Sequence, residues 1–130
     1  KSITLKEGKD ITIFCAGAMV KQCLEAAKIL DQKQIYAKVV NMHTIKPIDK
    51  KAVEESYNSK LIISVEEHNI VGGLGSAVAE HKAKLSKSPK QLFLGVKDIY
   101  SKGGSYKFLQ EKHRLTSEKI VEDIVLELGK

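Results

Sequence analysis

Apolar blocks with the composition of β-strands alternate with amphipathic helical patterns along most of the chain. The strand-like blocks are ITIFCAG (11–17), IYAKVVN (35–41), KLIISVE (60–66) and QLFLGVKD (91–98), preceded by a shorter ITL (3–5). Their β-branched and aromatic residues favour extended chain, and the segments between most of them are long enough for a helix. This alternation predicts parallel strands joined by right-handed helical crossovers.

The segments that separate or follow these blocks predict the helices. They are AMVKQCLEAAKIL (18–30), KKAVEESYN (50–58), SAVAEHKAKL (76–85), a short YKFLQEKH (106–113) and a final helix after Thr116. Asp49 is placed to cap the second of these helices, because its side chain can accept a backbone N–H of the first turn. Thr116 can cap the last helix in the same way, with Leu115 and Ile120 as a hydrophobic staple.

The expected fold is an α/β domain with three layers, α/β/α, around a mostly parallel sheet of about five strands. A length of 130 residues fits one domain, so we expect residues 1–130 to form a single unit. The chain starts with Lys rather than Met, and we expect it to be a fragment or a small subunit of a longer enzyme.

Charge and cysteine content favour a reduced, cytoplasmic setting with no nucleic acid and no membrane as partner. The 22 Lys and Arg residues exceed the 16 Asp and Glu residues, for a net charge of +6, but the lysines recur along nearly the whole chain and are not interleaved with aromatic residues. Cys15 and Cys23 are too few for a disulfide framework. No run approaches the roughly 20 apolar residues of a membrane span, and the first residues lack a signal-peptide core.

The turn GGLGS, which follows the third long strand-like block, is a candidate anion-binding turn made of Gly72, Gly73, Gly75 and Ser76. Ligands of open parallel sheets bind beyond the carboxyl ends of strands, and helix N-termini carry unpaired amides that attract anions. The spacing, however, is neither the G-x-G-x-x-G of dinucleotide folds nor a phosphate-cradling loop. The alternative is that the glycines, which allow positive φ and close backbone approach, only shape a sharp strand-to-helix turn.

Glu66, Glu67 and His68 stand just before this turn and are a candidate polar site at the end of a strand. The alternative is a solvated strand end in which one Glu forms a salt bridge or caps amides. The histidines lack zinc-site spacing, Cys15 has no evident base partner, and GLGSA misses the second glycine of a nucleophile elbow, which favours a capping or packing role for Ser76. We therefore assign no catalytic, cofactor-binding or metal residue to the chain.

Three blocks carry a family resemblance. VVNMHTIKPID (39–49), SVEEHNIVGGLGSAVAE (64–80) and HRLTSEKIVEDI (113–124), in this order, closely resemble the carboxyl-terminal domain of transketolases. The similarity covers almost the whole chain. A domain of the same fold forms the carboxyl-terminal part of 1-deoxyxylulose-5-phosphate synthases and of the beta chains of 2-oxoacid dehydrogenases. The TIKPID and EEH segments, however, look most like transketolase. The resemblance also implies one antiparallel edge strand.

Transketolases move a two-carbon ketol unit between sugar phosphates of the pentose phosphate pathway with thiamine diphosphate and a divalent metal such as Mg. Two other domains hold that cofactor across a dimer interface, and neither is recognisable in this sequence. The resemblance therefore implies a non-catalytic assembly domain, inactive alone and without a cofactor of its own. Its expected partner is the thiamine-binding domains or subunit of the same enzyme, within a homodimer of the full assembly.

Two other readings of the sequence stay open. One is the carboxyl-terminal domain of a 2-oxoacid dehydrogenase beta chain or of a deoxyxylulose-phosphate synthase. The other belongs to a different class of protein, a free-standing anion- or nucleotide-binding module, and it is supported by the basic charge balance and the glycine turn.

Overall fold

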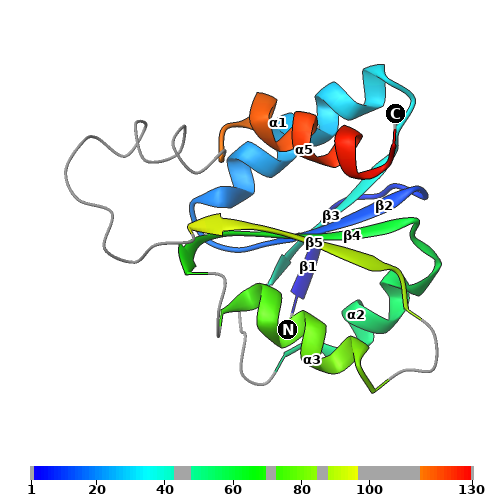
Figure 1. Cartoon of the computed structure of the whole chain (residues 1–130), viewed down its shortest axis with the longest axis vertical. Coiled ribbons are helices and arrows are strands. Elements are labelled where there is room, and N and C mark those ends of the chain that lie inside the picture. Colours follow the sequence, from blue (N-terminus) through cyan, green and yellow to red (C-terminus); the bar gives the residue numbers. More distant parts are fainter. Residues whose placement is uncertain (1, 43–47, 70–72, 85–87, 97–114, 130) are drawn as a thin grey trace.

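A computed structural model describes residues 2–42, 48–69, 73–84, 88–96 and 115–129, but not the side chains of 67–69 and 96. Five strands form one twisted sheet in the order β1-β3-β2-β4-β5 (Figure 1). They are β1 (Ser2–Lys6), β2 (Ile11–Cys15), β3 (Ala37–Met42), β4 (Leu61–Asn69) and β5 (Lys90–Val96). β1 runs antiparallel to β3, and the other neighbouring strands are parallel. The predicted mostly parallel sheet with one antiparallel edge strand is confirmed.

Helices cover both faces of this sheet, as the alternating pattern predicts (Figure 1). One face carries α1 (Met19–Gln32) and α5 (Ser117–Glu127), and the other carries α2 (Lys50–Glu55), a short 3-10 helix η1 (Ser56–Asn58) and α3 (Leu74–Lys82). All five residues of β2 are buried, because this central strand lies between two helical layers. The sheet therefore has a separate apolar core on each face.

The larger core joins the sheet to α1 and α5, and the smaller one joins it to α2 and α3. The fully buried side chains of the larger core include Ile11, Ile13, Met19, Cys23, Leu30, Ile63 and Ile120. Those of the smaller core include Phe14, Met42, Ile62, Leu74 and Val78. Successive residues of β2 thus supply opposite cores, which is why the strand reads as a continuous apolar run.

Both predicted side-chain caps are confirmed. The Asp49 carboxylate accepts the Ala52 amide at 3.1 Å, and the Thr116 hydroxyl accepts the Lys119 amide at 3.4 Å. α5 has a further cap that the sequence does not reveal, because the Gln22 side chain of α1 accepts the Ser117 amide at 2.9 Å. The carboxyl-terminal helix is therefore fixed on α1 by a hydrogen bond as well as by apolar packing.

Several element boundaries differ from the predictions, and three of these differences lie in α2, β4 and α3. β4 continues to Asn69, three residues past the predicted strand end. α3 begins at Leu74 with Gly73 as its N-cap, rather than at Ser76, because a side chain from β4 caps its first amides. α2 ends at Glu55 and continues as η1. The short helix predicted over 106–113 lies outside the described residues.

Asp49 also ties the start of the chain to α2, and this contact should make stability depend on acid pH. Its carboxylate accepts the Ser2 hydroxyl at 2.7 Å and the Ser2 amide at 3.1 Å. The Ser2 hydroxyl, followed by the Ala52 amide, holds the pKa of Asp49 below its ordinary value. A pKa lowered by folding means that the ionised carboxylate stabilises the fold above the unfolded-state pKa of about 3.9, and that this contribution is lost as pH falls through the lower folded-state pKa.

We therefore expect the stability difference between wild type and Asp49→Asn to narrow as pH falls from about 5 to about 2. Urea unfolding at a series of pH values measures it. Two curves that stay parallel over this range would contradict the assignment.

Candidate functional site

The polar group that the structure places at the end of β4 is the side chain of Glu66, which is only 6% exposed. One carboxylate oxygen accepts the Leu74 amide at 2.8 Å, and the other accepts the Gly75 amide at 2.7 Å. Gly73, the N-cap residue of α3, has no side chain with which to cap the helix. The strand that precedes α3 thus supplies the anion that the helix N-terminus attracts. Of the two alternatives for this segment, amide capping is the role that the structure shows for Glu66.

This contact bears directly on the candidate anion-binding turn. The amides of Leu74 and Gly75 already hold a carboxylate of the same chain, so a phosphate at these two amides would have to displace Glu66. Glu67 and His68 belong to the backbone of β4, but their side chains lie outside the described part, as does all of Gly72. Ser76 is half-buried in the first turn of α3 and is not its cap residue.

Gly75 is required for close packing and not for a special backbone angle. A Cβ atom at this position would lie 2.6 Å from Cδ2 of Phe93 and 2.7 Å from Oγ of Ser64. Gly75 lies within α3, and the φ of Gly73 is −96°, so neither glycine uses the positive φ that glycine allows. The glycine lets the first turn of α3 lie directly on β4 and β5.

Gln91 and Ser64, which the sequence does not mark as special, complete this corner. The Gln91 amide nitrogen, from β5, donates to the Gly75 carbonyl at 3.0 Å and lies 3.3 Å from the Ser64 hydroxyl. Ser64 is fully buried on β4. The edge strand β5 is therefore fastened to both its neighbour strand and α3, next to the Glu66 cap.

His81 fixes the other end of α3. Its Nε2 atom lies 2.9 Å from a Glu54 carboxylate oxygen of α2, and the His81 side chain is 10% exposed. Each end of α3 is thus held by a carboxylate from another element. Within the described ranges, His, Cys, Asp and Glu side chains form no group of three that could hold a metal ion.

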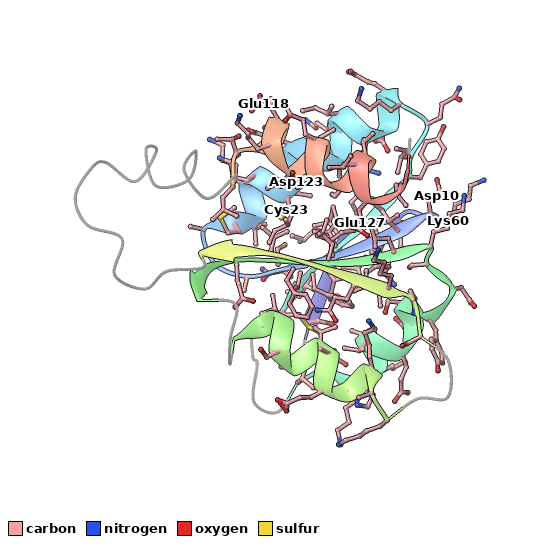
Figure 2. The ribbon with its side chains drawn as sticks, in the orientation of Figure 1. Asp10, Cys23, Lys60, Glu118, Asp123 and Glu127 are labelled. Atoms are coloured by element: carbon pink, nitrogen blue, oxygen red, sulfur yellow. The ribbon has the colours of Figure 1, made fainter. Side chains whose placement is uncertain are left out.

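A cavity of about 280 Å³ lies at the opposite, amino-terminal edge of β2 and β4. It is lined by Asp10, Ile11, Gln34, Ile35, Lys60 and Leu128. Figure 2 shows Asp10 and Lys60 side by side there, with Lys60 Nζ 4.0 Å from an Asp10 oxygen. One Asp10 oxygen also accepts the Tyr36 amide at 2.8 Å, and Lys60 is 70% exposed. This edge therefore carries a structural acidic residue beside a solvated lysine.

We expect Gly75→Ala to destabilise the protein by about 1–2 kcal/mol, because the added methyl group must push aside Phe93 or Ser64. This value is a net change, because alanine has a better helix propensity than glycine and so offsets part of the packing cost. Thermal unfolding measures the change. Ala77→Gly, two residues further along the same helix, measures the effect of helix propensity separately. An unchanged or raised melting temperature for Gly75→Ala would show that the corner relaxes freely.

The chain has a clear family counterpart. Residues 1–120 match the family described as transketolase, C-terminal domain. The chain belongs to this family, as its sequence resemblance indicates. None of the helices in the described ranges is both long and apolar enough to span a bilayer.

Among curated relatives, the chain is 37% identical over 130 residues to a putative transketolase C-terminal section of Methanocaldococcus jannaschii, covering 100% of this chain and 40% of the relative. It is 38% identical over 122 residues to the 6-deoxy-6-sulfo-D-fructose transketolase subunit SqwH of a Clostridium species, covering 93% and 38%. It is also 38% identical over 128 residues to the 1-deoxy-D-xylulose-5-phosphate synthase of Dictyoglomus turgidum, covering 96% and 20%. The chain thus spans less than half the length of each of these proteins.

Solved structures agree on the fold. A split gene transketolase described as an inactive beta4 tetramer superposes with a TM-score of 0.85 at 40% identity, over 94% of this chain and 40% of the other. Transketolase from Campylobacter jejuni superposes with a TM-score of 0.69 at 22% identity, over 99% of this chain and 18% of the other. The second match supports the fold alone.

Proposed function

We propose that this chain is the carboxyl-terminal, non-catalytic assembly domain of a thiamine-diphosphate-dependent transketolase, with residues 1–130 as one domain. The observation that carries the non-catalytic part is the Glu66 cap. Both oxygens of this buried carboxylate already accept backbone amides of α3, so this acid at the carboxyl edge of the sheet is used to hold the fold.

The length of the relatives supports the assembly part of the proposal. The chain spans 40% of a transketolase C-terminal section and 38% of a transketolase subunit. In the proposed enzyme, the other, thiamine-binding domains hold thiamine diphosphate and Mg. The full assembly is a homodimer in the cytoplasm. This chain supplies a rigid α/β unit that docks on those domains, and alone it transfers no ketol group.

A deoxyxylulose-phosphate synthase is the second candidate for the parent enzyme. The Dictyoglomus turgidum synthase is as similar in identity as the sulfofructose transketolase subunit. Both enzyme classes would use this domain in the same structural role, so the difference between them is one of reaction and not of fold.

Reconstitution tests the proposal. We would mix this chain with the polypeptide that carries the thiamine-binding domains and follow ketol transfer from xylulose 5-phosphate to ribose 5-phosphate, with each component alone as control. We expect activity only in the mixture. Activity with pyruvate and glyceraldehyde 3-phosphate instead would move the assignment to the synthase. Activity of this chain alone, or the absence of any association, would overturn the assembly role.

The free-standing anion-binding module needs its own test, since reconstitution does not address it. Calorimetry of the isolated chain with phosphate, sugar phosphates and nucleotides is expected to show no binding heat, because Glu66 occupies the amides of Leu74 and Gly75. Saturable binding that Glu66→Gln strengthens would favour the module and show that the carboxylate competes with the ligand.

A further inference from the structure

The cavity of about 280 Å³ at the amino-terminal edge of the sheet lies where both helices of one face end. Its lining includes Leu128, the C-cap residue of α5, and Gln34, which directly follows the C-cap residue of α1. Figure 1 shows α1 and α5 ending on the side of the sheet where β2 and β4 begin. A helix carries a partial negative charge at its carboxyl terminus, so this part of the cavity favours a cationic group.

Two opposite charges line the same cavity and are only loosely paired. The Asp10 side chain is 18% exposed, and one of its oxygens accepts the Tyr36 amide. The Lys60 side chain is 70% exposed, and its Nζ atom lies 4.0 Å from the other Asp10 oxygen, beyond the roughly 2.7–3.2 Å of a hydrogen bond. Exposed pairs of this kind contribute little to stability, so a ligand can separate the two groups with little loss.

Gln34 occupies a position that glycine would fill without strain. Its φ is 62°, in the left-handed region. The Gln34 amide donates to the Asp31 carbonyl and the next amide donates to the Leu30 carbonyl, which is the helix-ending motif that usually has glycine at this point. The Gln34 side chain is exposed, so core packing does not explain its presence. A strained residue beside a cavity points to a role in binding.

The charges of the cavity match a zwitterion better than a simple ion. An anion on Lys60 would lie near the Asp10 carboxylate and two negative helix ends, whereas a cation on Asp10 would lie near the Lys60 ammonium group. A molecule with an ammonium group and a carboxylate a few ångströms apart satisfies both charges. Apolar residues complete the lining and suit an aliphatic group: Ile11, Ile35 and Leu128.

We propose that this cavity binds a free α-amino acid with an aliphatic side chain. The ammonium group of the amino acid contacts Asp10 at the carboxyl ends of α1 and α5, and its carboxylate contacts Lys60 and the Gln34 side chain. Its aliphatic group packs against Leu128. The site lies at the edge of the sheet opposite the Glu66 cap and does not depend on the proposed assembly role.

Titration of the isotope-labelled chain with L-leucine, followed by the NMR shifts of backbone amides, tests the proposal. We expect saturable shifts at millimolar leucine, because so small a ligand binds weakly. The largest shifts should fall on the residues that line the cavity: Asp10, Ile11, Gln34, Ile35, Lys60 and Leu128. Isoamylamine lacks the carboxylate and isocaproate lacks the ammonium group, so each should bind at least about tenfold more weakly than leucine.

Three results of this titration would overturn the proposal. They are no saturable shift up to the solubility limit of leucine, largest shifts away from the cavity, and an affinity for isoamylamine or isocaproate that equals the affinity for leucine.

A variant of the exposed lysine tests which group of the ligand it binds. Lys60→Gln should weaken leucine about tenfold without weakening isoamylamine, so the preference between the two compounds is lost. Lys51→Gln removes another exposed lysine, from α2 on the other face of the sheet, and should leave both affinities unchanged. A Lys60→Gln variant that keeps the wild-type preference for leucine would overturn the proposal.

Two further variants test the other polar groups. Asp10→Asn keeps an oxygen for the Tyr36 amide but removes the negative charge, so leucine and isoamylamine should both bind about tenfold more weakly. Gln34→Gly should raise the melting temperature, because glycine adopts a positive φ without strain, and still weaken leucine binding. Unchanged leucine affinity in either variant would overturn the proposal. If Asp10→Asn fails to fold, Lys60→Gln still decides, because its side chain is exposed.

Discussion

Glu66→Ala is expected to lower the free energy of unfolding by about 2–4 kcal/mol, the largest loss we predict for a polar side chain in the described structure. The change removes both acceptors from the Leu74 and Gly75 amides, which lie in a buried corner where water cannot easily replace a carboxylate. It also removes a negative charge from the positive end of the α3 dipole. Urea unfolding followed by circular dichroism measures the loss.

Two variants separate the cap from general effects on α3. Glu80→Ala removes an exposed carboxylate from the same helix and should change stability by less than about 0.5 kcal/mol. Glu66→Gln keeps one acceptor oxygen but turns an amide nitrogen toward a backbone N–H, so its stability should fall between wild type and Glu66→Ala. A Glu66→Ala variant as stable as Glu80→Ala would show that the amides find other partners.

The Glu66→Gln substitution also tests the proposed function. If Glu66 only holds the fold, the Glu66→Gln variant should still associate with the thiamine-binding polypeptide. Each assembled complex should then transfer ketol groups at close to the wild-type rate. A complex that assembles normally but loses most of its turnover would place Glu66 near the chemistry and contradict the non-catalytic role.

The sequence predicts those parts of this fold that depend on short-range pattern. Alternating apolar blocks predict the parallel sheet because each buried strand must contribute residues to two helical layers. The caps at Asp49 and Thr116 are predictable because the acceptor and the amide it binds are three residues apart. The bond from Gln22 to Ser117 joins residues 95 positions apart, and no local pattern indicates it.

The candidate site is predictable as a location but not as an arrangement. Glu66 and Glu67 are chemically the same, and no local pattern indicates that Glu66 is the residue whose carboxylate accepts the amides of α3. The sequence likewise marks Gly73 and Gly75 equally, and only the packing of Phe93 and Ser64, from two strands, shows that Gly75 has no room for a side chain. Both distinctions arise from tertiary packing.

Gly8→Ala should destabilise the fold by about 3 kcal/mol or more, because the added methyl group meets backbone instead of a movable side chain. Gly8 lies in the turn between β1 and β2, and a Cβ there would lie 2.3 Å from the carbonyl carbon of Ala37 and 2.7 Å from its nitrogen. Ala37 is the fully buried first residue of β3 and pairs with Ile11 of β2. The turn can accept the methyl group only by moving away from β3 or by disturbing that pairing.

Gly129→Ala is the matched control, since it tests the opposite property of glycine. Gly129 has a φ of +79° and no atom within 4 Å of the position of a Cβ. Alanine there should cost only the strain of a left-handed backbone, about 1–2 kcal/mol. Chemical denaturation of both variants compares steric overlap with backbone strain in one protein. If Gly8→Ala costs no more than Gly129→Ala, the β1–β2 turn is free to shift, and the close approach of Gly8 to Ala37 is not what holds β1 and β2 against β3.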